Sequence, residues 1–237
     1  MAMTSTEQSP SLAFIKMTPD ADTQRVADLI YHTDDAYFRL LYGPQSQGIN
    51  RIVRLLVTPG HALNCEHIYL ATQGETILGV LWGYSATQQA SFSVTEQVAV
   101  VQAVGRLTSL RRWLLGPVLA RLLTTDVPLN TFYITALSID SHHRGRGVGS
   151  FLIQKIVCHA QSLGCSSLLL EVAEDNNSAR AFYALHGFQQ VRRNTLKLPW
   201  RTINTYTLER PLKIDIALQA VQRNTPEAKQ QGADETL

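Results

Sequence analysis

The sequence has 237 residues and a formal net charge of +2, so it is long enough for one domain with a sizeable core and carries no charge excess that favours nucleic acid or an anionic membrane as a partner. Its three cysteines, Cys65, Cys158 and Cys165, are odd in number and lack the spacing of a disulfide framework or a metal site. The cysteine pattern predicts no metal site. The polar start and the absence of about 18 consecutive apolar residues predict a soluble, cytoplasmic protein.

The first part of the chain predicts a strand, two helices and a hairpin. A short apolar run at 12–17 favours a strand, and an amphipathic helix follows it with Asp22 or Thr23 as its cap. A second helical pattern covers about 48–57. The segment 66–85 then predicts two strands around a glycine turn.

An apolar segment with several arginines follows, at 94–123. Its pattern predicts a helical insertion rather than a membrane span. The pair Gly116-Pro117 is expected to break or kink a helix there, because proline lacks the backbone N–H that the helix needs.

Strands and helices alternate in the rest of the chain. We expect strands at 130–140, 165–173, 188–193 and 204–210 and helices at 148–163 and 177–187. The predicted organisation is therefore a flexible start at 1–11, one domain at 12–211 that includes the insertion, and a disordered tail at 212–237.

The stretch HHRGRGVGSFL, residues 142–152, joins a predicted strand to a predicted helix through three glycines. The first N–H groups of a helix have no partners within it, so such a loop can bind an anion, and Arg144 and Arg146 add positive charge. An ordinary turn is the simplest alternative. A Walker A loop would need a lysine that is missing, and a dinucleotide fingerprint would need a third glycine where Ser150 stands, although Glu171 has a suitable spacing for ribose.

A second motif follows the loop in the sequence. Arg144 to Gly149 fits [Q/R]-x-x-G-x-[G/A], and Asn176, Ala179 and Tyr183 fit N-x-x-A-x-x-x-Y. Together these motifs resemble the acetyl-coenzyme A binding core of the GNAT N-acetyltransferase superfamily. The resemblance implies an α/β fold (α+β) with a central mixed, mostly antiparallel sheet of six to seven strands flanked by helices.

The resemblance also implies roles for particular residues. The strand before the loop pairs with the pantetheine arm, the loop amides hold the pyrophosphate, and Tyr183 protonates the departing thiolate while an amine attacks the thioester. The residues implied in binding acetyl-coenzyme A are Leu137, Ser138, Ile139, Arg144, Gly145, Arg146, Gly147, Val148, Gly149, Ser150, Asn176, Ala179 and Tyr183.

The general base departs from the commonest family pattern, because the strand before the loop carries no carboxylate ahead of Asp140. Glu171 precedes Tyr183 by twelve residues, a spacing similar to that of the base and acid in ribosomal-protein alanine acetyltransferases. We therefore predict Glu171 as the base, with a structural pairing to an arginine as the alternative. Tyr31, Asp34 and Tyr37, at (i, i+3) spacing, are candidates to bind a cationic amine.

The expected partner is a small-molecule or peptide amine, with the protein a monomer or a homodimer. The leading hypothesis is an N-acetyltransferase. The alternative is a non-catalytic acyl-coenzyme A sensor or interaction module, which the missing carboxylate on the strand before the loop favours.

Overall fold

The computed structural model describes residues 11–92, 101–119, 122, 127–198 and 201–213. They form one seven-stranded sheet in the order β1-β2-β3-β4-β5-β7-β6. The strands are β1 Leu12–Lys16, β2 Ile68–Gln73, β3 Thr76–Ser85, β4 Thr131–Ile139, β5 Ser167–Ala173, β6 Gln189–Leu198 and β7 Arg201–Pro211. Neighbours are antiparallel except for β4 and β5, which run parallel. The predicted mixed, mostly antiparallel sheet is therefore confirmed.

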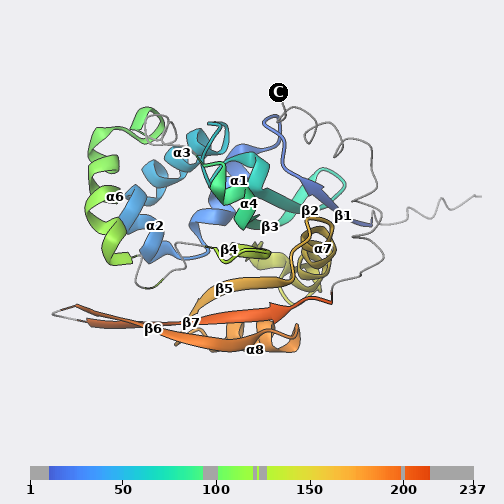
Figure 1. Ribbon diagram of the computed structural model, residues 1–237. Helices are drawn as coiled ribbons and strands as arrows, with labels where there is room; N and C mark the ends of the chain where they lie inside the picture. Colours follow the sequence, from blue (N-terminus) through green and yellow to red (C-terminus); the bar gives the residue numbers. More distant parts are fainter. Residues whose placement is uncertain (1–10, 93–100, 120–121, 123–126, 199–200, 214–237) are drawn as a thin grey trace, which may run out of the picture.

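Helices cover both faces of this sheet (Figure 1). They are α1 Thr23–Tyr31, α2 Asp35–Tyr42, α3 Gln45–Leu56, α4 Ala86–Ala90, α6 Arg106–Leu119, α7 Val148–Ser162 and α8 Asn177–Leu185, with short 3-10 turns η1 Cys65–His67 and η2 Ser141–His143. One apolar cluster joins α1, α2 and α3 to one face of the sheet, and a second joins α7 and α8 to the other. The sheet thus has a buried core on each side.

The strands β4 and β5 run together over only part of their length. Their pairing covers 131–134 of β4 and 167–170 of β5. Beyond that, β5 stays paired with β7 up to Ala173, while β4 stays paired with β3 up to Ile139. The register between β3 and β4 shifts at Thr135, and an extra residue of this kind bends a strand. The two strands therefore part after Ile134.

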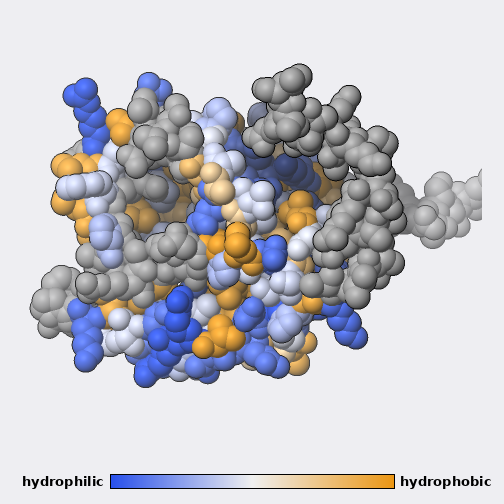
Figure 2. Space-filling view, in the orientation of Figure 1, coloured by the Kyte–Doolittle hydropathy of each residue, from blue (hydrophilic) through white to orange (hydrophobic). Residues whose placement is uncertain are grey.

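The structure corrects the prediction for the insertion. α6 continues through Gly116 and Pro117 to Leu119, so the expected break is wrong. A proline removes one backbone hydrogen bond from a helix. The hydrogen bonds of the neighbouring turns and the packing of α6 against α2 keep the helix continuous. The exposed face of α6 is apolar, with Leu110, Trp113 and Leu114 at 51%, 73% and 57% exposure, and it forms the hydrophobic area over α6 in Figure 2.

Other boundaries differ by a few residues. The two last strands are longer than predicted, since β6 and β7 face each other along almost their whole length. On α7 the buried residues are Val148, Leu152, Ile153, Ile156 and Ala160, whereas Leu163, which follows the last helical residue, is 44% exposed. The predictions for 1–10, 93–100, 120–121, 123–126 and 214–237 lie outside the described residues.

Two further observations concern the described part of the chain. None of its helices combines the length and the apolar character needed to cross a membrane. It also contains no group of three or more His, Cys, Asp or Glu side chains positioned to hold a metal ion.

Candidate functional site

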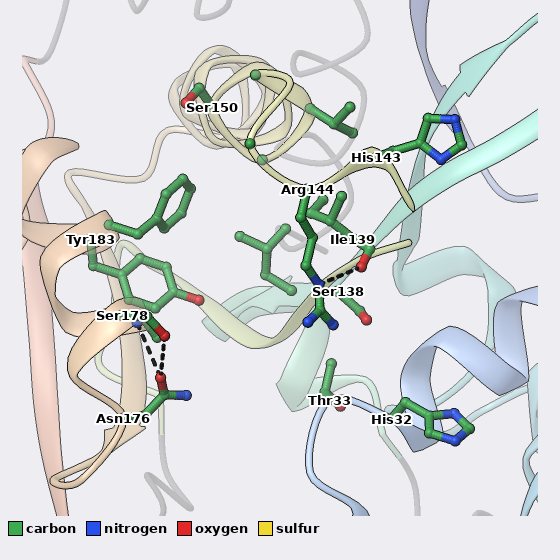
Figure 3. A pocket seen from close by; sticks show the side chains of 17 residues that line it. His32, Thr33, Ser138, Ile139, His143, Arg144, Ser150, Asn176, Ser178 and Tyr183 are labelled. Carbon is green, nitrogen blue, oxygen red and sulfur yellow. Dashed lines mark hydrogen bonds between the residues drawn. The ribbon is translucent and has the colours of Figure 1, made fainter. Parts of the chain in front are cut away.

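A cleft of about 700 Å³ lies where β4 parts from β5. Four segments line it: the end of β4, the glycine loop with the start of α7, one face of α8, and the connection between α1 and α2 with His32 and Thr33 (Figure 3). Its lining includes every residue predicted to bind the coenzyme except Arg146. His143, Ser178 and Phe182 also line the cleft and, like His32 and Thr33, were not predicted to bind the coenzyme.

The glycine loop presents backbone to this cleft. Gly145 and Gly147 have φ of +72° and +82°, a conformation that side chains disfavour, and a Cβ added at either would have no atom within 4 Å. Gly147 is also the N-cap of α7 and provides no side chain to satisfy the first amides of the helix. Those amides and the helix dipole favour an anion. The loop therefore fits a pyrophosphate group.

The two arginines of the loop differ in position. Arg144 lines the cleft and donates from Nε to the carbonyl of Ile139 at 3.2 Å. Arg146 is exposed and is not part of the lining. A phosphate contact by the Arg146 side chain stays a prediction.

Asp140, at the end of β4, ties the glycine loop to the rest of the fold. Its buried carboxylate accepts hydrogen bonds from the backbone of His142 and from Nδ1 of His143, both at 2.9 Å, and from the guanidinium of Arg25 on α1. The hydrogen bond from His143, assisted by Arg25, holds the pKa of Asp140 well below its usual range. Arg25 is 115 residues away in the chain, so no local sequence signal could have identified this pair.

α8 supplies the other wall of the cleft. Asn176 caps the helix, accepting from the amide of Ala179 at 3.1 Å. The ring of Tyr183 packs against Phe182 and Phe188, and its hydroxyl points into the cleft (Figure 3). No residue of the described chain forms a hydrogen bond with this hydroxyl, and burial raises its pKa well above the usual value. Tyr183 therefore keeps its proton at neutral pH.

A second cavity, of about 230 Å³, adjoins the cleft and shares five lining residues with it: Thr33, Leu137, Asn176, Ala179 and Tyr183. Asp34 at the start of α2 and Glu171 on β5 are the charged side chains in its described lining. Its aromatic lining consists of Tyr37, Phe38, Trp82, Tyr133 and Tyr183.

Glu171 is held by hydroxyl groups on two neighbouring strands. Its carboxylate accepts a hydrogen bond from Tyr133 on β4 and one from Thr207 on β7 at 3.4 Å. Burial raises the pKa of Tyr133 well above its ordinary value, and the adjacent Glu171 charge adds to the effect. Tyr133 therefore remains a donor, and it fixes one oxygen of Glu171 at the wall of the second cavity.

Glu174, three residues further, has a different environment. Tyr206, Arg193 and Asn204 surround its carboxylate and lower its pKa to about 2, with the Tyr206 hydrogen bond as the largest cause. Glu174 lines neither cavity. It links the β5–α8 connection to the last two strands.

The three residues predicted to bind an amine do not share a helical face. α1 ends at Tyr31 and α2 begins at Asp35, with Asp34 as its N-cap, so the shared face is wrong for Tyr31. Tyr31 is buried and its hydroxyl donates to the carbonyl of Gly43 at 2.9 Å. Asp34 and Tyr37 do line the second cavity.

Residues 60–188 match the Acetyltransferase (GNAT) family, which accounts for more than half of the chain. The protein therefore belongs to this family, whose members use acyl-coenzyme A donors. An N-acetyltransferase from Staphylococcus aureus Mu50 has a similar fold, with a TM-score of 0.63, 16% identity, and coverage of 83% of this chain and 99% of that one. A second acetyltransferase structure gives a TM-score of 0.60 at 20% identity, covering 85% of this chain and 100% of the other.

A relative known by sequence is N-acetyltransferase 8F1 of Rattus norvegicus, which is 29% identical over 73 residues. The match covers 31% of this chain and 33% of the relative.

Replacing Gly147 by valine is expected to weaken acetyl-coenzyme A binding by at least about tenfold, because a side chain there fills the space through which a phosphate reaches the backbone. Gly60→Val is the matched control, since Gly60 has the same φ of +82° and equally open surroundings but lines neither cavity. Calorimetric titration of both folded variants measures the effect. Equal affinities in the two variants would show that the loop backbone does not contact the coenzyme.

Replacing Asp140 by asparagine is expected to lower the free energy of unfolding by about 1 kcal/mol at neutral pH, since it removes the charge paired with Arg25. Because the pKa of Asp140 is depressed in the folded state, its contribution is fully present above the pKa of an unfolded carboxyl, about 4, and is lost progressively as the pH falls from there through the lower pKa of the folded state. Denaturant unfolding at neutral pH and below pH 4 measures this difference. A destabilisation independent of pH would mean that charge is not its cause.

Proposed function

We propose that the protein transfers the acetyl group of acetyl-coenzyme A to a primary amine by direct attack of the amine on the thioester. The observation that carries this proposal is the position of the Tyr183 hydroxyl. It lies at the junction of a cleft suited to an anionic nucleotide and a smaller cavity that contains a carboxylate. A thioester at that junction would have the acid beside its sulfur and the amine on its far side.

The donor-binding role follows from the open backbone of the cleft. The residues of β4 beyond the point of divergence, Leu137 to Ile139, have β3 on one side and the cleft on the other. An extended pantetheine arm can pair with such a backbone as an added strand does. The loop from Arg144 to Ser150 then takes the pyrophosphate, and Asn176 and Ala179 border the arm from α8.

Tyr183 is the proposed acid. As the bond between carbon and sulfur breaks, negative charge forms on sulfur, and Tyr183 donates its hydroxyl proton to it. A phenol is already protonated at neutral pH at its ordinary pKa of about 10, and burial raises the pKa of Tyr183 further. The absence of a hydrogen-bond partner in the described chain leaves the hydroxyl available to the leaving group.

Glu171 is the proposed base. Only a neutral amine can attack, so an alkylammonium group first loses one proton to solvent. As nitrogen then bonds to the acetyl carbon, a second N–H proton must leave, and Glu171 accepts it directly or through one water. Tyr133 and Thr207 hold the carboxylate in a fixed orientation. After the amide and the thiol leave, Tyr183 regains a proton from solvent and Glu171 releases its proton to solvent.

A non-catalytic acyl-coenzyme A sensor is the second candidate. The observation that favours it is that β4 carries no carboxylate ahead of the loop, and Thr131 near its start is buried and hydrogen-bonded to Ser167 at 3.1 Å. This candidate predicts coenzyme binding without turnover of any amine. Acetyl transfer well above the uncatalysed rate would eliminate it.

For Tyr183→Phe we expect unchanged affinity for acetyl-coenzyme A and a kcat lower by about 10² to 10⁴, which is typical for loss of a general acid. Tyr69→Phe is the control for loss of a buried hydroxyl, because Tyr69 bonds to His159 at 2.8 Å and lines neither cavity. Thiol release under single-turnover conditions gives the chemical rate. A Tyr183→Phe enzyme as fast as wild type would rule out Tyr183 as the acid.

For Glu171→Gln we expect a lower kcat and a flattened acidic limb in the pH profile of kcat/KM, because glutamine cannot accept the amine proton. Glu174→Gln removes a carboxylate three positions away that lines neither cavity, and its profile should match wild type. Measuring the profile with acceptor amines of different pKa distinguishes ionisation of the enzyme from ionisation of the amine. A wild-type profile for Glu171→Gln would assign proton removal to ordered water or to an amine that arrives neutral.

A further inference from the structure

The second cavity contains features that restrict the kind of amine it can accept. This inference rests on the proposed function, because it takes that cavity as the acceptor site. Asp34 and Glu171 are its charged residues, and no lysine, arginine or histidine lines it within the described chain. The two carboxylates therefore favour a cation and oppose a carboxylate on the ligand, with Asp34 acting from the exposed rim of the cavity, where solvent weakens its charge.

Asp34 retains capacity for a ligand despite its role as a helix cap. Its Oδ1 accepts from the amide of Tyr37 at 2.9 Å, which is the capping bond of α2. No further interaction in the described chain engages the carboxylate, so its second oxygen is available to a ligand. The charge of Asp34 is not required for capping, because asparagine caps a helix equally well.

Two polar atoms in the aromatic lining of the second cavity are already occupied within the protein. The indole N–H of Trp82 is occupied by the carbonyl of Ala62 at 2.7 Å, and the hydroxyl of Tyr133 by Glu171. With Tyr37 and Phe38 they supply aromatic surface to the lining. Such walls stabilise both an apolar body and an alkylammonium group.

The size of the cavity adds a further limit. Its volume of about 230 Å³ is below the roughly 300 to 1,000 Å³ of typical ligand sites. It is large enough for a short alkyl arm with one ring, whereas further residues of a peptide would extend beyond it.

We propose that the acceptor is a small primary amine joined by a short alkyl arm to an aromatic or other apolar body, without a carboxylate, and that Asp34 is the residue that selects against carboxylates. An arylalkylamine fits this description and an amino acid does not. The reacting nitrogen lies toward Glu171 and Tyr183, and the body lies between Trp82 and the α2 aromatics.

Equilibrium binding to the protein saturated with coenzyme A tests this inference without relying on catalysis. The probes are phenethylamine and phenylalanine, which differ only by a carboxylate, phenylalanine amide, in which that group is neutral, and ethylamine, which lacks the ring. We expect phenethylamine to bind at least about tenfold more tightly than phenylalanine and ethylamine, with the amide in between. In Asp34→Asn the preference over phenylalanine should fall several-fold.

Asp22→Asn is the matched control, because Asp22 caps α1 through the amide of Arg25 at 2.9 Å and lines neither cavity. Its preference should equal that of wild type. Equal binding of phenethylamine and phenylalanine, or an unchanged preference in Asp34→Asn, would overturn the inference. So would an amidated peptide beginning with phenylalanine that binds more than about tenfold better than phenethylamine.

Turnover of the same compounds with acetyl-coenzyme A separates this inference from the proposed function. Acetylated product without the predicted binding preference contradicts only the acceptor class. The predicted preference without any product supports the cavity assignment and contradicts the transferase.

Discussion

The structure depends most on the separation of β4 from β5. Both strands keep their outer partners, β3 and β7, but the parallel pairing between them ends at Ile134, where an extra residue at Thr135 shifts the register with β3. The backbone of β4 beyond that point faces a cleft instead of a strand. The same divergence opens the space between the start of α7 and α8, so the site is a direct consequence of strand pairing.

Charge is distributed unevenly along this opening. At one end the glycine loop presents unpaired amides, the positive end of the α7 dipole and Arg144, and all of these favour an anion. At the other end Asp34 and Glu171 favour a cation. Tyr183 lies where the two regions meet and is uncharged at neutral pH, as a phenol ordinarily is, and burial raises its pKa further. In the proposed function, the phosphates lie at the glycine loop, the thioester at Tyr183 and the amine in the second cavity.

Features set by neighbouring residues could be predicted from the sequence. The glycine loop and the order of the elements from β4 onward depend on local spacing, and the structure matches them. Before β4, the helices α2 and α4 were not predicted as separate elements. Features set by strand register or distant packing could not: the hydrogen bond from Tyr133 to Glu171 spans 38 residues and that from Arg25 to Asp140 spans 115. The division between α1 and α2 did leave a local signal, since an aspartate before a helical run is a common cap.

Amide hydrogen exchange with and without acetyl-coenzyme A tests the central claim, that the diverged half of β4 and the glycine loop bind the donor. The account predicts slower exchange on binding in 136–139 and 145–150, because backbone groups there gain partners. Exchange in 131–134 should not change, since that segment is already paired with β3 and β5. Tight binding without added protection in 136–139 and 145–150 would contradict the account.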